Sequence, residues 1–285
     1  MTSILRSRLR NIARATRYEA GSIVEDIALF TRMGNAHCAF RQSRIDGLNV
    51  LVRAEEDVGR SLYFMREFER HESSYLFRSV RETDICLDVG ANAGFYTLGF
   101  AKRAVKGMVH AFEPLAMNYH MLALNVLSNE FANVTLNNCA VGEEDGEADL
   151  YIASDGAYCS LADTGRKAIV GTARTALTRL DSYCARRALS RVDLLKIDVE
   201  GAELAVLRGA EALLSDPARK PRLIMLELFE PMLTRFGSTV EEVCAFLKHR
   251  EYEALVLTGG RLVPFTAPHY NHYYNVMFVQ TLPSR

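Results

Sequence analysis

The sequence predicts an α/β fold in which a mainly parallel sheet is covered by helices on both faces. Short apolar runs of β type alternate with stretches of helical spacing from residue 84 onward, and the loops between them are short. Several of these runs end in an acidic residue, as expected where the carboxyl ends of parallel strands form a ligand-binding rim. The 285 residues suit one large α/β domain. We place it at 81–285, after an N-terminal α+β extension at 1–80.

The expected elements of the main domain follow in order. Strands are predicted at 84–88, 108–113, 134–136, 192–198, 223–228, 252–257 and 273–280, and helices at 94–104, 115–128, 203–214 and 239–249. Residues 148–152 and 168–175 also have β character. They flank a polar loop, 153–166, whose length is typical of a lid or substrate wall, although a plain surface excursion is an equal alternative. Asp181 is expected to cap a short helix that ends at Ala188.

The extension carries no obvious chemistry. Asp46-Gly47 between two β-prone runs, 38–45 and 48–52, predicts a hairpin, and a helical pattern covers 61–80. A weaker helical pattern covers 18–35. Residues 1–17 hold five arginines and no acid. Such a segment can contact a membrane surface or act as a transit-like presequence, and the alternative is a solvated leader.

Composition excludes several classes of protein. The net charge of −1 offers no broad basic track for nucleic acid. The six cysteines are scattered without a C-x-x-C pair, which argues against a zinc cage or a disulfide framework and for a reducing, cytoplasmic compartment. No apolar run approaches the roughly 18–20 residues that cross a bilayer. There is no secretory signal pattern.

The stretch around residues 88–97 is the best candidate for a ligand-binding turn. Gly90-Ala-Asn-Ala-Gly94 resembles a dinucleotide fingerprint, but Asn92 replaces the middle glycine. Asp88 precedes the turn, which disfavours a pyrophosphate, and therefore NAD, and favours a ligand with a cationic amino-acid tail. Glu113 lies 23 residues after Gly90, the spacing at which an acid binds ribose hydroxyls. The turn and the two acids together are much more specific than a glycine turn alone.

Several motifs occur in an order that resembles the FkbM family of S-adenosylmethionine-dependent methyltransferases. They are Asp88-Val-Gly-Ala-Asn-Ala-Gly-Phe-Tyr96, Phe112-Glu-Pro114, Ala140-Val-Gly142, Lys196-Ile-Asp-Val-Glu-Gly-Ala-Glu203 and Glu227-Leu-Phe-Glu-Pro231. The resemblance covers about 83–280. It implies a class I methyltransferase fold, with seven strands in the order 3-2-1-4-5-7-6 and an antiparallel strand 7 at 273–280.

The resemblance also implies site residues. It assigns the methionine end of S-adenosylmethionine to the turn and the start of the next helix, the ribose to an acid with help from the following helix, and the adenine to a short segment further on. The residues for the methionine end are Asp88, Gly90, Asn92, Gly94, Tyr96 and Thr97. Those for the ribose are Glu113 and Asn118, and those for the adenine are Cys139, Ala140 and Val141. Asp198 and Glu200 would stand beside the reactive methyl group, so Asp198 is both a cofactor-binding and a catalytic candidate.

The implied reaction is O-methylation of a hydroxyl on a sugar, a glycan or a secondary metabolite, which requires a base near the acceptor. The candidates are Asp198, Glu200, Glu227 and the pair His269 and His272. We favour Asp198, which ends a strand; the alternative is that it orients the cofactor or pairs with Lys196, which needs an acid inside its apolar strand.

Three further expectations concern partners. Two histidines three residues apart are a poor metal site, so no metal is expected. The acceptor is expected to be a small molecule or a glycan, not nucleic acid. The alternative function is a non-catalytic cofactor-binding module that engages a partner or a membrane through the extension.

Overall fold

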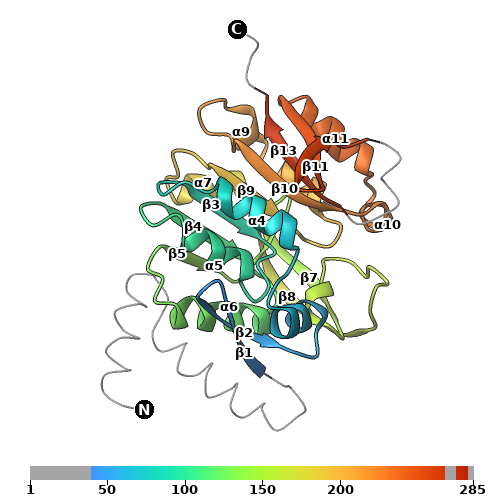
Figure 1. Ribbon diagram of the computed structural model, residues 1–285. Helices are drawn as coiled ribbons and strands as arrows, with labels where there is room; N and C mark the ends of the chain where they lie inside the picture. The colour runs from blue at the N-terminus through green and yellow to red at the C-terminus, as the bar shows by residue number, and fades with distance from the viewer. Residues whose placement is uncertain (1–39, 267–273, 282–285) are drawn as a thin grey trace.

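The computed structural model describes residues 40–266 and 274–281. Its centre is an eight-stranded sheet in the order β12-β11-β13-β10-β9-β3-β4-β5 (Figure 1). In chain order these strands are β3 (Ile85–Val89), β4 (Met108–Phe112), β5 (Val134–Asn137), β9 (Leu194–Ile197), β10 (Leu223–Leu228), β11 (Tyr252–Thr258), β12 (Arg261–Pro264) and β13 (Tyr274–Gln280).

The strand order confirms the fold that the resemblance implied. β3, β4, β5, β9 and β10 pair in parallel, while β13 is antiparallel to both β10 and β11. Seven of these strands, all except β12, therefore follow the order 3-2-1-4-5-7-6 when they are numbered along the chain. The eighth, β12, was not predicted; it forms a hairpin with β11 because Gly259 and Gly260 both adopt positive φ.

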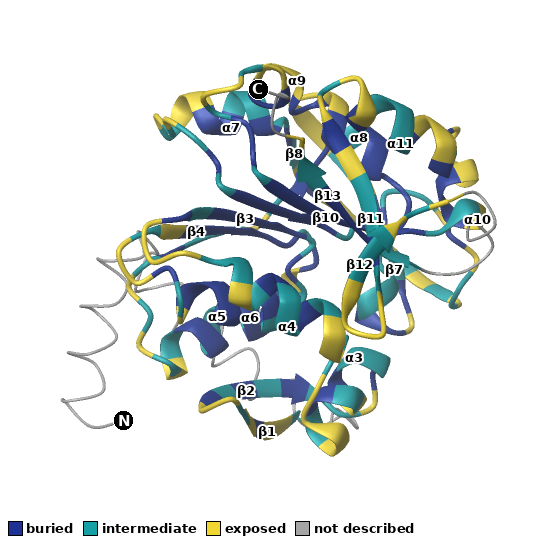
Figure 2. Ribbon diagram, turned by 45° about the horizontal axis from the view of Figure 1, so that its top comes forward, coloured by how far each residue is buried: buried dark blue, intermediate teal, exposed yellow. Residues whose placement is uncertain are grey.

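Helices cover both faces of the sheet (Figure 2). One face is packed by α4, α5 and α6, and the other by α7, α8, α9 and α11, each against its own apolar core. These helices are α4 (Arg70–Ser79), α5 (Phe95–Ala101), α6 (Ala116–Ser128), α7 (Leu180–Arg186), α8 (Glu203–Arg208), α9 (Glu211–Ser215) and α11 (Val240–Lys248); the short α10 (Glu230–Leu233) follows β10. No helix of the described residues is long and apolar enough to cross a membrane.

Two helix predictions are wrong in detail. The single helix expected at 203–214 is split at Gly209, where an added Cβ would lie 2.0 Å from the carbonyl oxygen of Gly142. Asp181 does not cap its own helix, whose N-cap is Arg179. Its carboxylate instead accepts hydrogen bonds from the backbone N–H groups of Ala212 and Leu213 in the first turn of α9.

A small second sheet fills the irregular middle of the chain. It has the order β6-β8-β7, formed by β6 (Ala140–Val141), β7 (Gly146–Ala153) and β8 (Ile169–Thr178). The two predicted strands on either side of the polar loop are therefore confirmed, with β8 longer than expected. The loop itself contains a turn of 3-10 helix at Gly156–Tyr158.

The extension is a hairpin followed by broken helices. β1 (Phe40–Ile45) and β2 (Leu48–Arg53) confirm the hairpin, with Asp46 and Gly47 both at positive φ. The single helix expected at 61–80 is wrong. The chain forms α3 (Asp57–Arg60), a π-helical turn η1 (Ser61–Met65) and then α4, because Arg66 and Glu69 adopt left-handed backbone conformations.

The extension shares one core with the main sheet. Leu62 and Leu76 are fully buried in the same cluster as Leu98 and Phe100 of α5, which explains why their spacing predicted one helix. The side-chain amide of Asn125 in α6 also bonds both the N–H and the C=O of Leu51 in β2. The segments expected at 1–17 and 18–35 lie outside the described residues, as do residues 38, 39 and 273.

Candidate functional site

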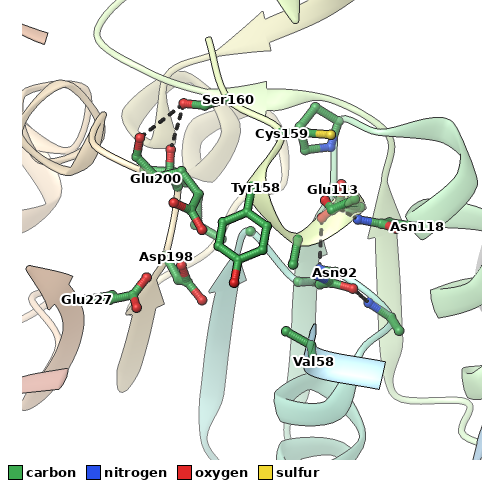
Figure 3. Close-up of a pocket in the computed structure, with 18 of the residues that line it drawn as sticks. Val58, Asn92, Glu113, Asn118, Tyr158, Cys159, Ser160, Asp198, Glu200 and Glu227 are labelled. Atoms are coloured by element: carbon green, nitrogen blue, oxygen red, sulfur yellow. Dashed lines mark hydrogen bonds between the residues drawn. The ribbon is translucent and has the colours of Figure 1, made fainter. Parts of the chain in front are cut away.

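A cavity of about 360 Å³ opens at the carboxyl ends of β3, β4, β9 and β10 (Figure 3). That volume is within the usual range for a small-molecule site. Its walls come from these strand ends, from the start of α5, from the loop between β7 and β8, and from the extension. Predicted residues on the wall are Gly90, Asn92, Tyr96, Glu113, Asn118, Cys139, Ala140, Val141, Asp198, Glu200 and Glu227.

The turn after β3 is fixed by close backbone packing. Gly90 has φ +76, and an added Cβ would lie 1.8 Å from the carbonyl oxygen of Asp198. Asn92 also has positive φ, at +50, and its side-chain oxygen accepts a hydrogen bond from the N–H of Ala93. Gly94 is not on the cavity wall; its missing side chain leaves room for Leu122 of α6. The turn therefore presents backbone to the cavity at Gly90 and Asn92.

Glu113 is held at the cavity by the backbone on both sides. Its two carboxylate oxygens accept hydrogen bonds from the N–H groups of Asn92, at 2.8 Å, and of Leu115, at 2.9 Å. Burial raises the pKa of Glu113 to about 7, against those two hydrogen bonds and the charge of Lys196, which lower it. Its position is therefore tied directly to the turn.

Asp88 and Thr97 lie behind the cavity wall. Asp88 is completely buried, and one of its oxygens accepts a hydrogen bond from the hydroxyl of Thr97 at 2.5 Å. Its other oxygen lies 3.6 Å from the ammonium of Lys196. Burial raises the pKa of Asp88, and the charge of Lys196 opposes that rise. Asp88 therefore does not face the cavity itself, and its link to the cavity is its ion pair with Lys196, which lines the wall.

Lys196 links three parts of the site. Its ammonium lies 3.2 Å from the carboxylate of Asp198, donates to the carbonyl of Gly90 at 3.0 Å, and lies 5.2 Å from the centre of the Tyr96 ring. Burial alone would lower the pKa of Lys196, but the carboxylates of Asp198, Asp88 and Glu69 outweigh burial and raise it. The expected acid partners of this lysine are therefore present.

Three predicted carboxylates meet at the ends of β9 and β10. Asp198, Glu200 and Glu227 each place one oxygen within 4.8 Å of the others, an arrangement that could hold a metal ion. Two of them already face a cation, because Arg166 lies 2.5 Å from Glu200 and Lys196 contacts Asp198. Burial, with the nearby charge of Asp198, raises the pKa of Glu200 to about 8 and that of Glu227 well above its ordinary value. The other base candidates, His269 and His272, lie outside the described residues.

Sequence reasoning missed the residues that close the cavity from the extension and the β7–β8 loop. Glu69 accepts hydrogen bonds from Tyr96, at 2.5 Å, and from Asn275, at 2.6 Å. Tyr158 donates to Asp57 at 2.7 Å, and Arg166 stacks on its ring at 4.1 Å. The length and polarity of residues 153–166 were the only features of the sequence that pointed to this part of the cavity. The position of the loop agrees with the prediction that it forms a wall. Nothing in the sequence marked Glu69 as a site residue.

The residues proposed for the adenine also line the cavity. Cys139, Ala140 and Val141 lead into and form β6 beside the cavity. Asn118 of α6 donates from its amide to the carbonyl of Gly156 in the β7–β8 loop, at 3.1 Å. This hydrogen bond joins the helix after β4 to the loop that covers the cavity.

Comparisons with known proteins support a family assignment. Residues 88–254 match the model of the methyltransferase FkbM domain. The chain is 29% identical over 194 residues to the 31-O-demethyl-FK506 methyltransferase FkbM of Streptomyces tacrolimicus, covering 55% of this chain and 72% of that protein. It is 30% identical over 212 residues to the AMB antimetabolite synthetase AmbE of Pseudomonas aeruginosa, covering 60% of this chain but 10% of that protein.

A crystal structure of methyltransferase FkbM from Methylobacillus flagellatus has 17% identity and a TM-score of 0.46, covering 75% of this chain and 49% of that one. The region that matches the family model, residues 88–254, contains the turn after β3, Glu113 and all three clustered carboxylates. The chain belongs to the FkbM family of methyltransferases.

Proposed function

We propose that this methyltransferase uses S-adenosylmethionine to methylate a hydroxyl oxygen on a small-molecule or glycan acceptor. The observation that carries the proposal is the junction of Glu113 with the turn at 90–94 in one cavity that also contains Asp198. A buried acid beside a tight turn suits a ribose, and the clustered carboxylates suit a cationic ligand tail. The name of the Streptomyces relative supports oxygen as the methylated atom.

The residues divide between the two ends of the cofactor. Glu113 would accept hydrogen bonds from the ribose hydroxyls, with Asn118 beside it, and Cys139 through Val141 would pack against the adenine. The turn at Gly90 and Asn92, Tyr96 and Asp198 would surround the methionine end. Asp88, Gly94 and Thr97 would support this wall from behind. S-adenosylmethionine supplies an activated methyl group, so the chain must bring the acceptor oxygen into line with it.

Asp198 is our proposed base. It lies at the end of β9 with 28% of its side chain exposed, whereas Glu200 is 8% exposed and paired with Arg166. A base must reach the acceptor hydroxyl and take its proton. Burial and the nearby charge of Asp198 raise the pKa of Glu227, so Glu227 gives up its own proton less readily than an exposed glutamate. Because two of the three carboxylates already have a protein cation, we propose that the site works without a metal.

The five described cysteines are unpaired, which supports the cytoplasm as the compartment.

Binding of S-adenosylhomocysteine tests the cofactor. We expect isothermal titration to show binding to the folded protein and Glu113→Gln to weaken it at least tenfold, because hydrogen bonds to a charged group contribute roughly 1.5–3 kcal/mol each. Glu144→Gln, at an exposed position outside the cavity, is the matched control and should bind like the wild type. Absence of binding in well-folded wild-type protein would refute the proposal.

Methyl transfer tests the catalytic role of Asp198. With an acceptor found by screening hydroxylated compounds and radiolabelled cofactor, Asp198→Asn should lower the rate about 10²–10⁴-fold, the usual contribution of a general base. EDTA should leave the wild-type rate unchanged. Glu67→Gln, an exposed acid outside this cavity, is the control. If Asp198→Asn turns over at the wild-type rate, another residue is the base. If EDTA abolishes the rate and Mg²⁺ restores it, a metal binds at the carboxylates.

A further inference from the structure

Residues 61–70 of the extension line both the functional cavity and a second hollow. Ser61 and Leu62 line the functional cavity, and Phe68 lines both. Between Leu62 and Phe68, the side chains of Phe64 and Met65 point to solvent, and 69% and 70% of their surface is exposed. One turn of π-helix therefore has a cavity-facing side and a bare apolar side.

The exposed apolar pair is unusual for this molecule. Among the described residues, the large hydrophobic side chains with high exposure are Phe64, Met65, Val105, Met108 and Val170. Only Phe64 and Met65 are adjacent in sequence, in the exposed stretch between α3 and α4 (Figure 2). Scattered exposed hydrophobics need no explanation, whereas a projecting aromatic and methionine pair is typical of a contact surface.

The second hollow, of about 320 Å³, is rich in arginine. Arg66, Arg70, Arg78 and Arg103 line it, against two acids, so it carries an excess of positive charge. Arg70 and Arg103 have acidic neighbours, but Arg66 and Arg78 form no salt bridge with any described residue. Arg78 donates one hydrogen bond to the hydroxyl of Ser74, and its remaining N–H groups, like those of Arg66, can bind an anion. Arg66 directly follows the exposed Phe64-Met65 pair.

We propose that residues 61–70 dock the protein on an anionic phospholipid surface. Phe64 and Met65 enter the interfacial layer, and Arg66, Arg70, Arg78 and Arg103 contact the headgroups. A surface that combines projecting apolar side chains with basic residues binds anionic membranes both by burying apolar area and by electrostatic attraction. Duplex nucleic acid would use the charge but, with its bases paired and stacked, would leave the Phe64-Met65 pair without a partner. The proposal needs no contribution from residues 1–17.

Docking in this way would place one wall of the functional cavity at the membrane. Ser61 and Leu62 belong to the same π-helical turn as the inserted pair, so the cavity wall lies within a few residues of the lipid. The proposal is nevertheless independent of the methyl acceptor. It can fail while cofactor binding holds, because Phe64, Met65, Arg66 and Arg78 do not line the functional cavity.

Sedimentation with vesicles tests the proposal on the 285-residue chain. We expect binding to phosphatidylcholine vesicles that contain phosphatidylserine, weak binding to pure phosphatidylcholine, and a steep decrease with salt. The double variant Phe64→Ser with Met65→Ser should bind at least tenfold more weakly. Arg66→Gln with Arg78→Gln should lose about fivefold for each arginine. Val170→Ser, at an equally exposed valine of β8, is the matched control and should bind like the wild type.

Several outcomes would overturn the proposal. They are no vesicle binding by the wild type, equal binding to neutral vesicles, or full binding by the Phe64 and Met65 double variant, which would place the contact elsewhere in the chain. Competition by inorganic phosphate with no effect of the double variant would show a soluble anion site. A dimer in gel filtration that the double variant abolishes, without vesicle binding, would show a second copy on this surface. Titration with S-adenosylhomocysteine in each variant confirms that the cavity is intact.

Discussion

Gly90→Ala is expected to abolish cofactor binding. An alanine Cβ at this position would lie 1.8 Å from the carbonyl oxygen of Asp198 and 2.9 Å from its carbonyl carbon. Both neighbours are backbone atoms, so no side chain can rotate to relieve the contact. The turn must therefore move away from β9, and with it the N–H of Asn92 that holds Glu113. We expect affinity for S-adenosylhomocysteine to fall at least a hundredfold in isothermal titration.

Gly237→Ala is the control that separates the clash from the backbone conformation. Gly237 also has positive φ, at +69 against +76, but nothing lies within 4 Å of its added Cβ. A left-handed alanine costs roughly 1–2 kcal/mol in either position. Gly237→Ala should therefore lower the midpoint of thermal unfolding slightly and leave cofactor affinity unchanged. Near-normal affinity in folded Gly90→Ala would show that the turn does not position the cofactor.

Sequence reasoning located the sheet and most of the cavity because both depend on local patterns. Apolar runs alternating with helical spacing define the strands and helices, and the acid at the end of a run marks the rim. Glu113, Asp198 and Glu227 were found in this way. The order of the strands came from the family resemblance, since periodicity does not show which strand lies beside which.

The depth of a side chain behind the rim could not be read from the sequence. In the sequence Asp88 ends an apolar run in the same manner as Glu113. In the structure Asp88 lies inside β3 and is fully buried behind Lys196, whereas Glu113 follows β4 and faces the cavity. The difference depends on where Lys196, more than a hundred residues away, places its ammonium. A strand lysine predicted a buried acid partner, but not which of Asp88 and Asp198 would remain accessible.

Residues from the extension could not be predicted because their roles depend on long-range packing. Glu69 is bonded to Asn275, which is 206 positions away, and it occupies a left-handed backbone conformation that ends the predicted 61–80 helix. Strain of this kind persists only where the surrounding structure enforces it. The periodicity around Glu69 is dominated by Leu62 and Leu76, so the pattern predicted one helix and concealed the break.

Lys196→Met is expected to cause the largest loss of stability among substitutions in the site. The methionine fills similar space but removes the only cation that pairs with the completely buried Asp88 among the residues that the structure describes. Breaking a buried ion pair by removing one partner typically costs 3–5 kcal/mol, because the remaining charge is left without compensation. We expect a loss of about that size in the free energy of unfolding, measured with urea near neutral pH.

The loss should depend on pH in a direction that identifies Asp88. Burial already raises the pKa of Asp88, and removing Lys196 removes the opposing charge, so the pKa rises further. A carboxyl whose pKa is higher in the folded than in the unfolded state binds more protons when folded. The variant's stability therefore falls as pH rises above the ordinary pKa of 3.8 and through the raised value. The deficit relative to the wild type should shrink as the buffer is acidified toward pH 4.

Lys220→Met is the matched control for a buried lysine. Its side chain is only 3% exposed, close to the 4% of Lys196, but its acidic partner Glu251 is 65% exposed and 2.8 Å away. After substitution, water can solvate Glu251, so the loss should be much smaller, about 1 kcal/mol. Equal losses in the two variants, or a Lys196→Met deficit that does not change with pH, would show that the charge on Asp88 is not what Lys196 compensates. The lysine would then act on the turn through its hydrogen bond to Gly90.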